Sequence, residues 1–244
     1  MKRADDKSHL IFLFLPFVPS LFNVFFIDLP PLETKCLFCP LSTNLRGDKL
    51  STIKFLKQEE KGRLFGSLDT DERRHAVRNR AILYLAEYCG LRATEVCLLK
   101  MDDYDTLQSS IYCTRLKKGN DNTIRIIDPR VQAAINDYLN IRDTQYKESE
   151  YLFVSQKGTA LSRKSLDKIM KYHCMRADIP ASKQHFHVLR HTRAIELAEY
   201  GFDTKDIQWW LGHKRIGTTT IYMKYTTRQQ DSMYDKLALA LKEE

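Results

Sequence analysis

The chain has 244 residues, enough for one or two domains with a buried core, and its net charge of +8 suits a polyanionic partner. The six cysteines are irregularly spaced. Cys36 and Cys39 form a C-x-x-C pair, but no second pair completes a four-cysteine zinc site. Composition therefore argues against such a zinc site and favours a reducing, intracellular compartment.

Residues 1–53 begin with three basic side chains, which precede the apolar run LIFLFLPFVPSLFNVFFIDL. This order is typical of a signal or membrane segment. Pro16, Pro19 and Asn23 interrupt the run, and no small-residue cleavage site follows it. Three interpretations remain: a poorly ordered leader, a membrane anchor, or a start site placed too far upstream. The first and third are favoured, and the segment is assigned to no domain.

From residue 54 the chain shows helical periodicity. Residues 55–68 predict a short surface helix that ends at Gly66. Asp69 or Thr70 is placed to cap a second helix, which Gly90 ends. The apolar positions of this second helix share one face: Val77, Ala81, Ile82 and Leu85.

The following GLRATEVCLL places Arg92 directly after a turn, at the start of another short helix. The N-terminus of a helix after a turn is a good place to hold a basic side chain against a phosphate. The alternative is an exposed arginine that pairs with Glu95. The next segments, SIYCTRL and TIRIID, are rich in β-branched and aromatic residues and predict a hairpin.

KKGNDN joins the two strands, with turn residues Gly119 and Asn120 after Lys117 and Lys118 at the tip. A lysine pair on a hairpin is solvated, makes a nonspecific phosphate contact, or has a specific role. Further along the chain Pro129 opens a helix, and YLFVSQKGTALS predicts a third strand and a turn. The predicted fold is α+β and mainly α-helical, with a small three-stranded antiparallel sheet.

Ser162 is placed to cap a helix with three lysines opposite its apolar face. They either follow a polyanion backbone or are simply solvated: Lys164, Lys168 and Lys171. In the next stretch Gly201 ends a helix and Asp203 caps another.

Residues 187–225 hold four side chains whose chemistry suits phosphoryl transfer. Arg190 carries a planar, charged fork that matches two oxygens of one phosphate. His187 and His213 can accept or donate a proton near neutral pH, and the phenol of Tyr222 can attack phosphorus once its proton is removed. Cations and imidazoles neutralise transition-state charge here, and no metal or cofactor is predicted.

A zinc site is the alternative for the histidines in this stretch, because His187 and His191 are spaced four apart as in a zinc helix. The zinc protease pattern has a glutamate beside the first histidine, where this chain has Val188, and no third ligand is evident. The zinc interpretation is therefore given little weight.

HVLRHT resembles the H-x-x-R-H-[ST] box of the tyrosine recombinase (phage integrase) family, WWLGH its LGH box, and TTTIYMKY the segment that carries its nucleophile. The resemblance covers roughly residues 54–228. It implies a catalytic domain similar to the short fimbrial-type invertases and Xer-like recombinases. Family members usually also carry an N-terminal core-binding domain of helices, and nothing before residue 54 has that pattern, so a truncated integrase remnant is a competing interpretation.

The resemblance implies six catalytic residues: Arg92, Lys118, His187, Arg190, His213 and Tyr222. The two arginines and His213 hold the nonbridging phosphate oxygens, and His187 helps to accept the tyrosine proton. Lys118, with Lys117 as the alternative, protonates the leaving 5′ oxygen. The product is a 3′-phosphotyrosine, which a 5′ hydroxyl resolves without ATP. The expected activity is site-specific DNA integration, excision or inversion.

The same resemblance implies partners and a location. The partners are double-stranded DNA, three further copies of the chain on two DNA sites, and accessory DNA-bending proteins, with a monomer expected in the absence of DNA. Residues 229–244 predict a tail helix that packs on its own core or docks in a neighbouring subunit. A cytoplasmic, nucleoid-associated location is expected. Two alternatives remain open: relaxation of DNA by a type IB topoisomerase mechanism, and DNA binding without strand exchange.

Overall fold

The computed structural model describes residues 53–116, 119–226, 234, 237–239 and 241. The predicted apolar segment up to residue 52 lies outside the described residues, as do Lys117 and Lys118. Within the predicted tail helix, the described residues 234 and 237–239 are helical. None of the helices in the described ranges is long and apolar enough to cross a bilayer.

Helices α1 (Gln58–Asp69) and α2 (Ala76–Tyr88) match the first two predicted helices in position but not at every boundary. Gly66 was predicted to end the first helix, and this prediction is wrong. Gly66 lies inside α1, and a Cβ built on it would have no neighbour within 4 Å. The helix continues to Asp69, which places the side chain of Leu68 in the core. Burial of the next apolar side chain outweighs the conformational cost of one helical glycine.

The predicted cap of α2 is also wrong, because both candidate side chains bond elsewhere. The carboxylate of Asp69 accepts a hydrogen bond from the Tyr84 hydroxyl, and the Thr70 hydroxyl donates to the carbonyl of Gly66. Helix α2 begins without a side-chain cap. Its predicted end is confirmed, since Gly90 follows the helix with a φ of +60°.

A three-stranded antiparallel sheet follows α3 (Ala93–Leu98), as the fold class predicted. Its strands, in spatial order, are β1 (Tyr104–Asp105), β2 (Ser110–Cys113) and β3 (Asn122–Arg125). The predicted hairpin is β2–β3, in which Ile111 lies opposite Ile124, and both side chains are buried. The hairpin therefore packs one face on the helical core.

The third strand was predicted in the wrong segment. Residues 151–154 form only isolated bridges, from Lys100 to Tyr151 and from Val154 to Ala160. The third strand is β1 instead, paired with β2. A strand of two residues shows no alternating pattern in the sequence, so periodicity could not have found it.

The remaining elements are helical: η1 (Met101–Asp103), α4 (Pro129–Gln145), α5 (Arg163–Arg176), η2 (Ala181–Lys183), α6 (His187–Glu199), α7 (Thr204–Leu211), η3 (Ile216–Thr218) and η4 (Tyr222–Tyr225). Three of the predicted helix starts are confirmed. Pro129 is the first residue of α4, and the side chains of Ser162 and Asp203 accept hydrogen bonds from the first turns of α5 and α7. Gly201 follows α6 with a φ of +92°, as predicted.

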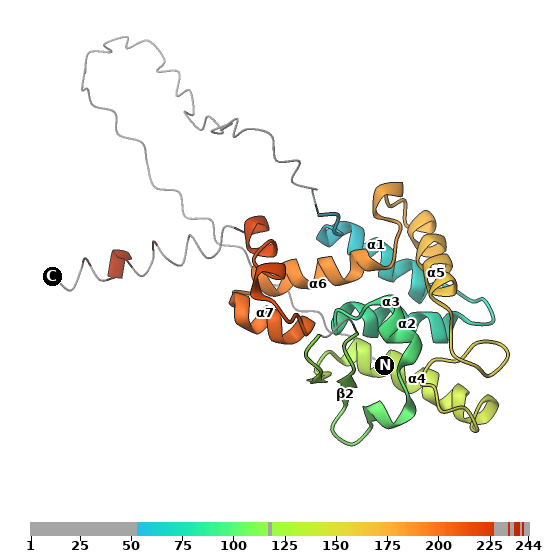
Figure 1. The fold of residues 1–244 in the computed structure, drawn as a ribbon. Coiled ribbons are helices and arrows are strands. Elements are labelled where there is room, and N and C mark those ends of the chain that lie inside the picture. Colours follow the sequence, from blue (N-terminus) through green and yellow to red (C-terminus); the bar gives the residue numbers. More distant parts are fainter. Residues whose placement is uncertain (1–52, 117–118, 227–233, 235–236, 240, 242–244) are drawn as a thin grey trace, which may run out of the picture. The chain divides into compact units, whose positions relative to one another are not determined.

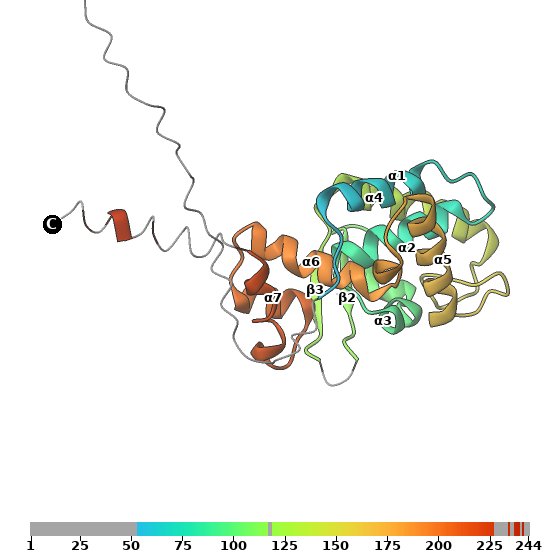
Figure 2. The ribbon, with the colours of Figure 1, turned by 90° about the horizontal axis from the view of Figure 1, so that it is seen from above.

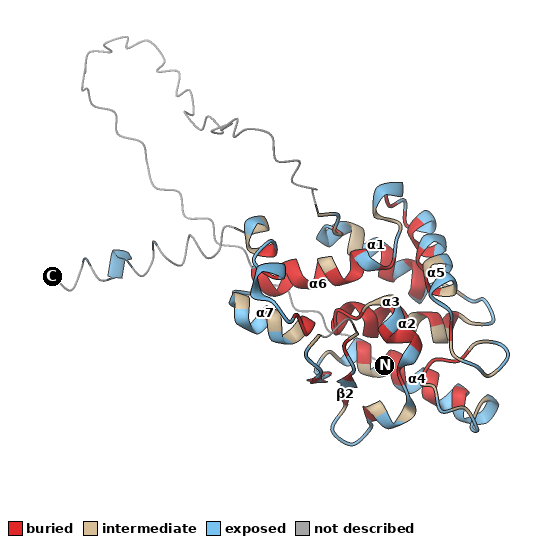
Figure 3. Cartoon of the chain, in the orientation of Figure 1, coloured by how far each residue is buried: buried red, intermediate tan, exposed pale blue. Residues whose placement is uncertain are grey.

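Helix α2 is the centre of the core and lies between α6 and α4 (Figure 1). Ten of its thirteen residues are buried and none is fully exposed, and Figure 3 shows the buried residues concentrated in α2 and α6. Helix α7 and η4 pack on α6, and Figure 2 shows the β2–β3 hairpin extending beside α7. The ends of α2, α6, α7 and the hairpin therefore meet in one region.

A buried charge cluster ties α1 to α2 and α6. Lys61 Nζ donates to Glu87 Oε1 at 2.7 Å and to Glu196 Oε1 at 2.5 Å, and both carboxylates are less than a tenth exposed. Burial raises the pKa of Glu87 to about 7 despite the lysine. Since the unfolded glutamate has a pKa near 4.5, this group's contribution to stability is lost as the pH rises from about 4.5 to 7.

We predict that Lys61→Met lowers the free energy of unfolding by about 3–5 kcal/mol at pH 8, because it leaves the buried Glu87 carboxylate without its ion-pair partner and leaves Glu196 with only Arg193, 3.5 Å away. The loss is expected to shrink at pH 5, where Glu87 has taken up a proton in the folded state. Chemical denaturation at both pH values measures it. Lys100→Met, which breaks a solvent-exposed pair with Glu150, is the control and should leave stability unchanged. Equal losses at pH 5 and pH 8 would contradict the buried-pair interpretation.

Candidate active site

Arg92 lies at the N-cap of α3, directly after the turn at Gly90, as predicted. The Glu95 carboxylate accepts hydrogen bonds from the Arg92 amide at 2.9 Å and from Arg92 Nη1 at 2.6 Å. The predicted alternative, pairing with Glu95, is therefore real. It does not remove Arg92 from a binding role, because the guanidinium also lines an open pocket of about 810 Å³.

Arg190 reaches the same pocket from α6 and is almost fully buried. Its Nη1 donates to the Gly90 carbonyl at 2.6 Å and its Nη2 to the Leu211 carbonyl at 2.7 Å. Burial, with the charge of Arg92, lowers the pKa of Arg190 to about 9, so the side chain stays charged at neutral pH. A desolvated, charged fork whose two carbonyl contacts fix its plane is prepared to bind an anion.

His213 is presented by the turn that ends α7, where Gly212 adopts a left-handed φ of +64°. Its Nδ1 shares a hydrogen bond of 2.8 Å with the Thr219 hydroxyl, which fixes the ring. Burial, together with the charges of Arg190 and Arg92, lowers the pKa of His213 to about 3. The imidazole is therefore neutral at pH 7 and can donate one N–H bond into the pocket.

Tyr222 begins η4 and is buried, and its ring stacks on that of His213 with centroids 6.4 Å apart and planes 9° from parallel. The Tyr222 hydroxyl lies 3.0 Å from His191 Nδ1. Burial raises the pKa of Tyr222, while the charges of Arg190 and Arg92 act in the opposite direction. The phenol is therefore protonated at neutral pH and needs a base to become a nucleophile.

The residue in contact with the tyrosine hydroxyl is thus His191, whereas the sequence pointed to His187. His187 lines the pocket from the first turn of α6, and its ring meets that of His191 edge to face, with centroids 4.4 Å apart. A spacing of four residues along a helix brings both rings to one face, but η4 packs on α6 so that the Tyr222 hydroxyl meets His191. In the sequence the i, i+4 spacing of the two histidines indicates only the zinc alternative, so it does not single out His191 as the partner of Tyr222.

Five of the six predicted residues therefore line one pocket: Arg92, His187, Arg190, His213 and Tyr222. The sixth, Lys118, and its alternative Lys117 lie outside the described residues. Helix α5 adds Arg163, Lys168 and Lys171 to the pocket lining. Two of the three lysines for which the sequence left open a polyanion contact or simple solvation thus line the pocket.

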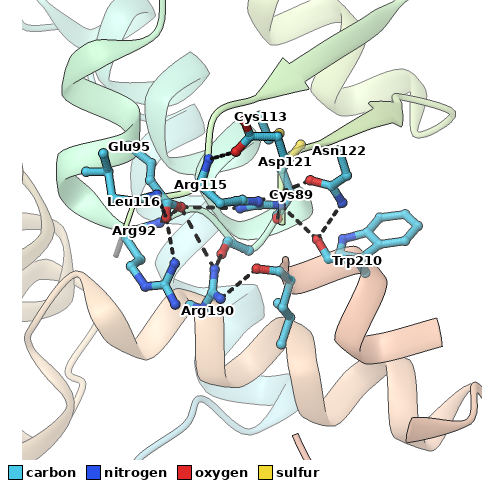
Figure 4. A network of polar contacts seen from close by, with 12 residues as sticks. Cys89, Arg92, Glu95, Cys113, Arg115, Leu116, Asp121, Asn122, Arg190 and Trp210 are labelled. Carbon is cyan, nitrogen blue, oxygen red and sulfur yellow. Dashed lines mark hydrogen bonds and ion pairs between the residues drawn. The ribbon is translucent and has the colours of Figure 1, made fainter. Parts of the chain in front are cut away.

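Arg115 is a site residue that the sequence analysis missed. Its guanidinium has no exposed surface, and its Nη1 lies 3.3 Å from Glu95 Oε2 (Figure 4). The signal was the alternation of strand β2 and its extension. Ile111, Cys113 and Arg115 are buried while the two residues between them are exposed, so the arginine occupies an inward-facing position.

Within the described ranges, no group of three or more histidine, cysteine or acidic side chains is arranged as a metal site. The four cysteines described are free and buried, whereas Cys36 and Cys39 lie outside those ranges. His191 Nδ1 faces the Tyr222 hydroxyl, so the pair His187 and His191 contributes to the phenol's surroundings.

Comparison with known proteins identifies relatives of this site and fold. Residues 54–229 match the phage integrase family. The chain is 38% identical over 149 residues to the type 1 fimbriae regulatory protein FimB of Escherichia coli (strain K12), covering 61% of this chain and 74% of FimB. It is 31% identical to the tyrosine recombinase XerC of Caldanaerobacter subterraneus subsp. tengcongensis, covering 69% of this chain and 46% of XerC.

Solved structures give the same result. The crystal structure of XerA recombinase superposes with a TM-score of 0.63 at 30% identity, covering 75% of this chain and 63% of that chain. The XerH site-specific recombinase bound to a palindromic difH substrate, a post-cleavage complex, shares the fold with a TM-score of 0.65 at 24% identity, covering 83% of this chain and 58% of that chain. The chain thus spans about half the length of the XerC relative and about three fifths of the XerA and XerH chains.

Proposed function

The chain belongs to the phage integrase family, and from this premise we propose that it is a tyrosine-type site-specific DNA recombinase with Tyr222 as its nucleophile. One observation carries the proposal. The hydroxyl of Tyr222 lies against an imidazole, in the same pocket as two arginines and a neutral histidine. This is the set of groups that transfer of a phosphodiester to a phenol requires.

In the first step the Tyr222 oxygen attacks the scissile phosphorus, an O–P bond forms, and the bond from phosphorus to the 5′ oxygen breaks. Arg92 and Arg190 bind the nonbridging oxygens, and His213 adds a hydrogen bond as negative charge builds. Lys118 gives its proton to the leaving 5′ oxygen. The diester bond is kept in the 3′-phosphotyrosine, so attack by the 5′ hydroxyl of a partner strand reverses the step without ATP.

The tyrosine proton goes to an imidazole. The family resemblance assigns this role to His187, whereas the contact in the structure favours His191, whose Nδ1 lies 3.0 Å from the phenol oxygen. Burial, with the neighbouring His187, lowers the pKa of His191 to about 4, so the ring is neutral at pH 7 and has a lone pair to accept a proton.

We expect the assembly to be a monomer without DNA and a tetramer on two DNA sites, with accessory proteins that bend the DNA, in a nucleoid-associated pool. The basic residues that α5 contributes to the pocket support duplex binding, since a duplex is contacted mainly through its phosphates.

The first test uses a binding site selected from a random-sequence DNA pool, synthesised with a nick that lets the cleaved end diffuse away. Wild type is expected to form a covalent adduct on a denaturing gel, and Tyr222→Phe to form none, because it lacks the attacking oxygen. Binding without an adduct in the wild type would favour a DNA-binding regulator. Relaxation of supercoiled plasmid without a specific site would favour a topoisomerase.

A second test separates the two imidazoles with a 5′-bridging phosphorothiolate, whose sulfur leaves without a proton. On this substrate the cleavage rate of Lys118→Ala should return to that of the wild type, because the leaving group needs no proton. A variant that cannot activate Tyr222 should still cleave slowly. We predict that His191→Phe remains at least about a hundredfold slower than wild type in single-turnover cleavage. His187→Phe is the matched variant. Wild-type rates for His191→Phe, with only His187→Phe slow, would assign the base role to His187 instead.

A third test concerns the rim. Lys168→Ala and Lys171→Ala should each weaken binding to all duplexes alike and reduce the slope of log affinity against log salt by about one, since each removes one phosphate contact. Lys164→Ala, on the same helix at a position that does not line the pocket, is the control. Fluorescence anisotropy over a salt series measures the slope. A slope that changes as much in Lys164→Ala would show that the pocket rim has no special place in binding.

A further inference from the structure

Two arginines lie side by side across the same pair of helix ends. Arg190 donates to the carbonyls of Gly90 and Leu211. Arg115 donates to the carbonyls of the residues just before these, Cys89 at 3.3 Å and Trp210 at 2.7 Å. Each guanidinium therefore bridges the C-terminal end of α2 to the C-terminal end of α7.

The physical basis is that a helix ends with carbonyls that have no partner within the helix and carry partial negative charge. Buried, these carbonyls need donors, and a guanidinium has five N–H groups in a fixed plane. The side chain of Arg115 has no exposed surface, and a third contact joins its Nε to the amide oxygen of Asn122 at 3.1 Å. Its guanidinium is held by the protein alone, out of reach of a ligand.

Arg115 is also joined to the arginines of the pocket through one carboxylate. Glu95 bonds Arg92 at 2.6 Å and Arg115 at 3.3 Å, and lies 3.9 Å from Arg190 (Figure 4). Three guanidinium charges against one carboxylate leave a charge of +2 at this cluster. The excess positive charge favours binding of an anion in the pocket. The position of this charge depends on Arg115, which holds both helix ends.

The stem of Arg115 fixes the loop that carries His213. A Cβ built on Gly212 would lie 2.5 Å from Arg115 Cγ, and one on Gly119 would lie 2.7 Å from Arg115 Cβ. The two glycines thus enclose the stem from the hairpin and from the end of α7, and the amide of Asn120 donates to the Gly212 carbonyl at 3.2 Å. His213 follows Gly212 directly, so a shift of Arg115 moves the ring.

We infer that Arg115 is a positioning residue of the phosphate site, which sets the places of Arg190 and His213 without touching DNA. The inference rests on the proposed function. The competing role is a purely structural one, like that of Arg142, another buried arginine that donates to the carbonyls of Tyr151 and Leu152 and does not line the pocket.

The experiment compares Arg115→Lys with Arg142→Lys, since both keep the charge and lose the planar fork. Thermal unfolding measures the stability lost by each, and site affinity and single-turnover adduct formation are measured on the nicked duplex. At comparable loss of Tm, Arg115→Lys should cleave at least about tenfold more slowly with affinity within about twofold of wild type, because a small misplacement of the oxygen-binding groups slows chemistry. If the two variants lose cleavage rate in the same proportion to their loss of Tm, the inference is overturned.

A second readout uses a methylphosphonate at the scissile position, which removes one phosphate charge. If Arg115 acts by placing Arg190 against that charge, the slowing caused by Arg115→Lys should shrink on this substrate, whereas a structural defect would slow both substrates equally. If the wild type forms no adduct, the recombinase assignment fails. The inference is then decided by the rise in Tm with inorganic phosphate: a rise that both Arg190→Ala and Arg115→Lys abolish supports it, and any other result overturns it.

Discussion

The site depends on the interaction of the buried Glu95 carboxylate with three arginines. It caps the first turn of α3 by accepting from the Arg92 amide, and it lies within 4 Å of guanidinium groups from α3, α6 and the hairpin. Burial would raise the pKa of Glu95, but the Arg92 amide and the charges of Arg190 and Arg115 outweigh it, and the net shift is downward. The carboxylate therefore stays ionised and allows like charges to share one pocket.

Burial, together with the charges of the pocket, determines the protonation of its imidazoles. Burial and the arginines keep His213 neutral at pH 7, and burial beside His187 does the same for His191. A neutral His213 can donate to a phosphate oxygen, and a neutral His191 can accept from the phenol. Burial, with the arginines at His213 and with His187 at His191, thus leaves both histidines in the states that the proposed tyrosine attack needs. His213 and His191 have the same side chain, so their different proposed roles, donor and proton acceptor, come from where each one lies in the pocket.

Many of the helix boundaries could be predicted from the order of residues alone. Helix starts at Pro129, Ser162 and Asp203 follow from local capping, and the end of α2 follows from Gly90, because glycine readily adopts the left-handed φ found there. The boundary at Gly66 and the strand β1 could not be found, since the first is decided by burial of Leu68 and the second by pairing with β2. Long-range contacts override local preference at both places.

The sequence by itself determined the family and the types of side chain in the site. H-x-x-R-H, LGH and a following tyrosine are short motifs that can be recognised from the order of residues alone. Only the tertiary structure decided which histidine touches Tyr222 and that Arg115 joins the cluster. Both contacts span distant parts of the chain, 31 residues from His191 to Tyr222 and 95 from Arg115 to the Trp210 carbonyl. Such contacts depend on how α6, α7, η4 and the hairpin pack, and packing is a property of the whole fold.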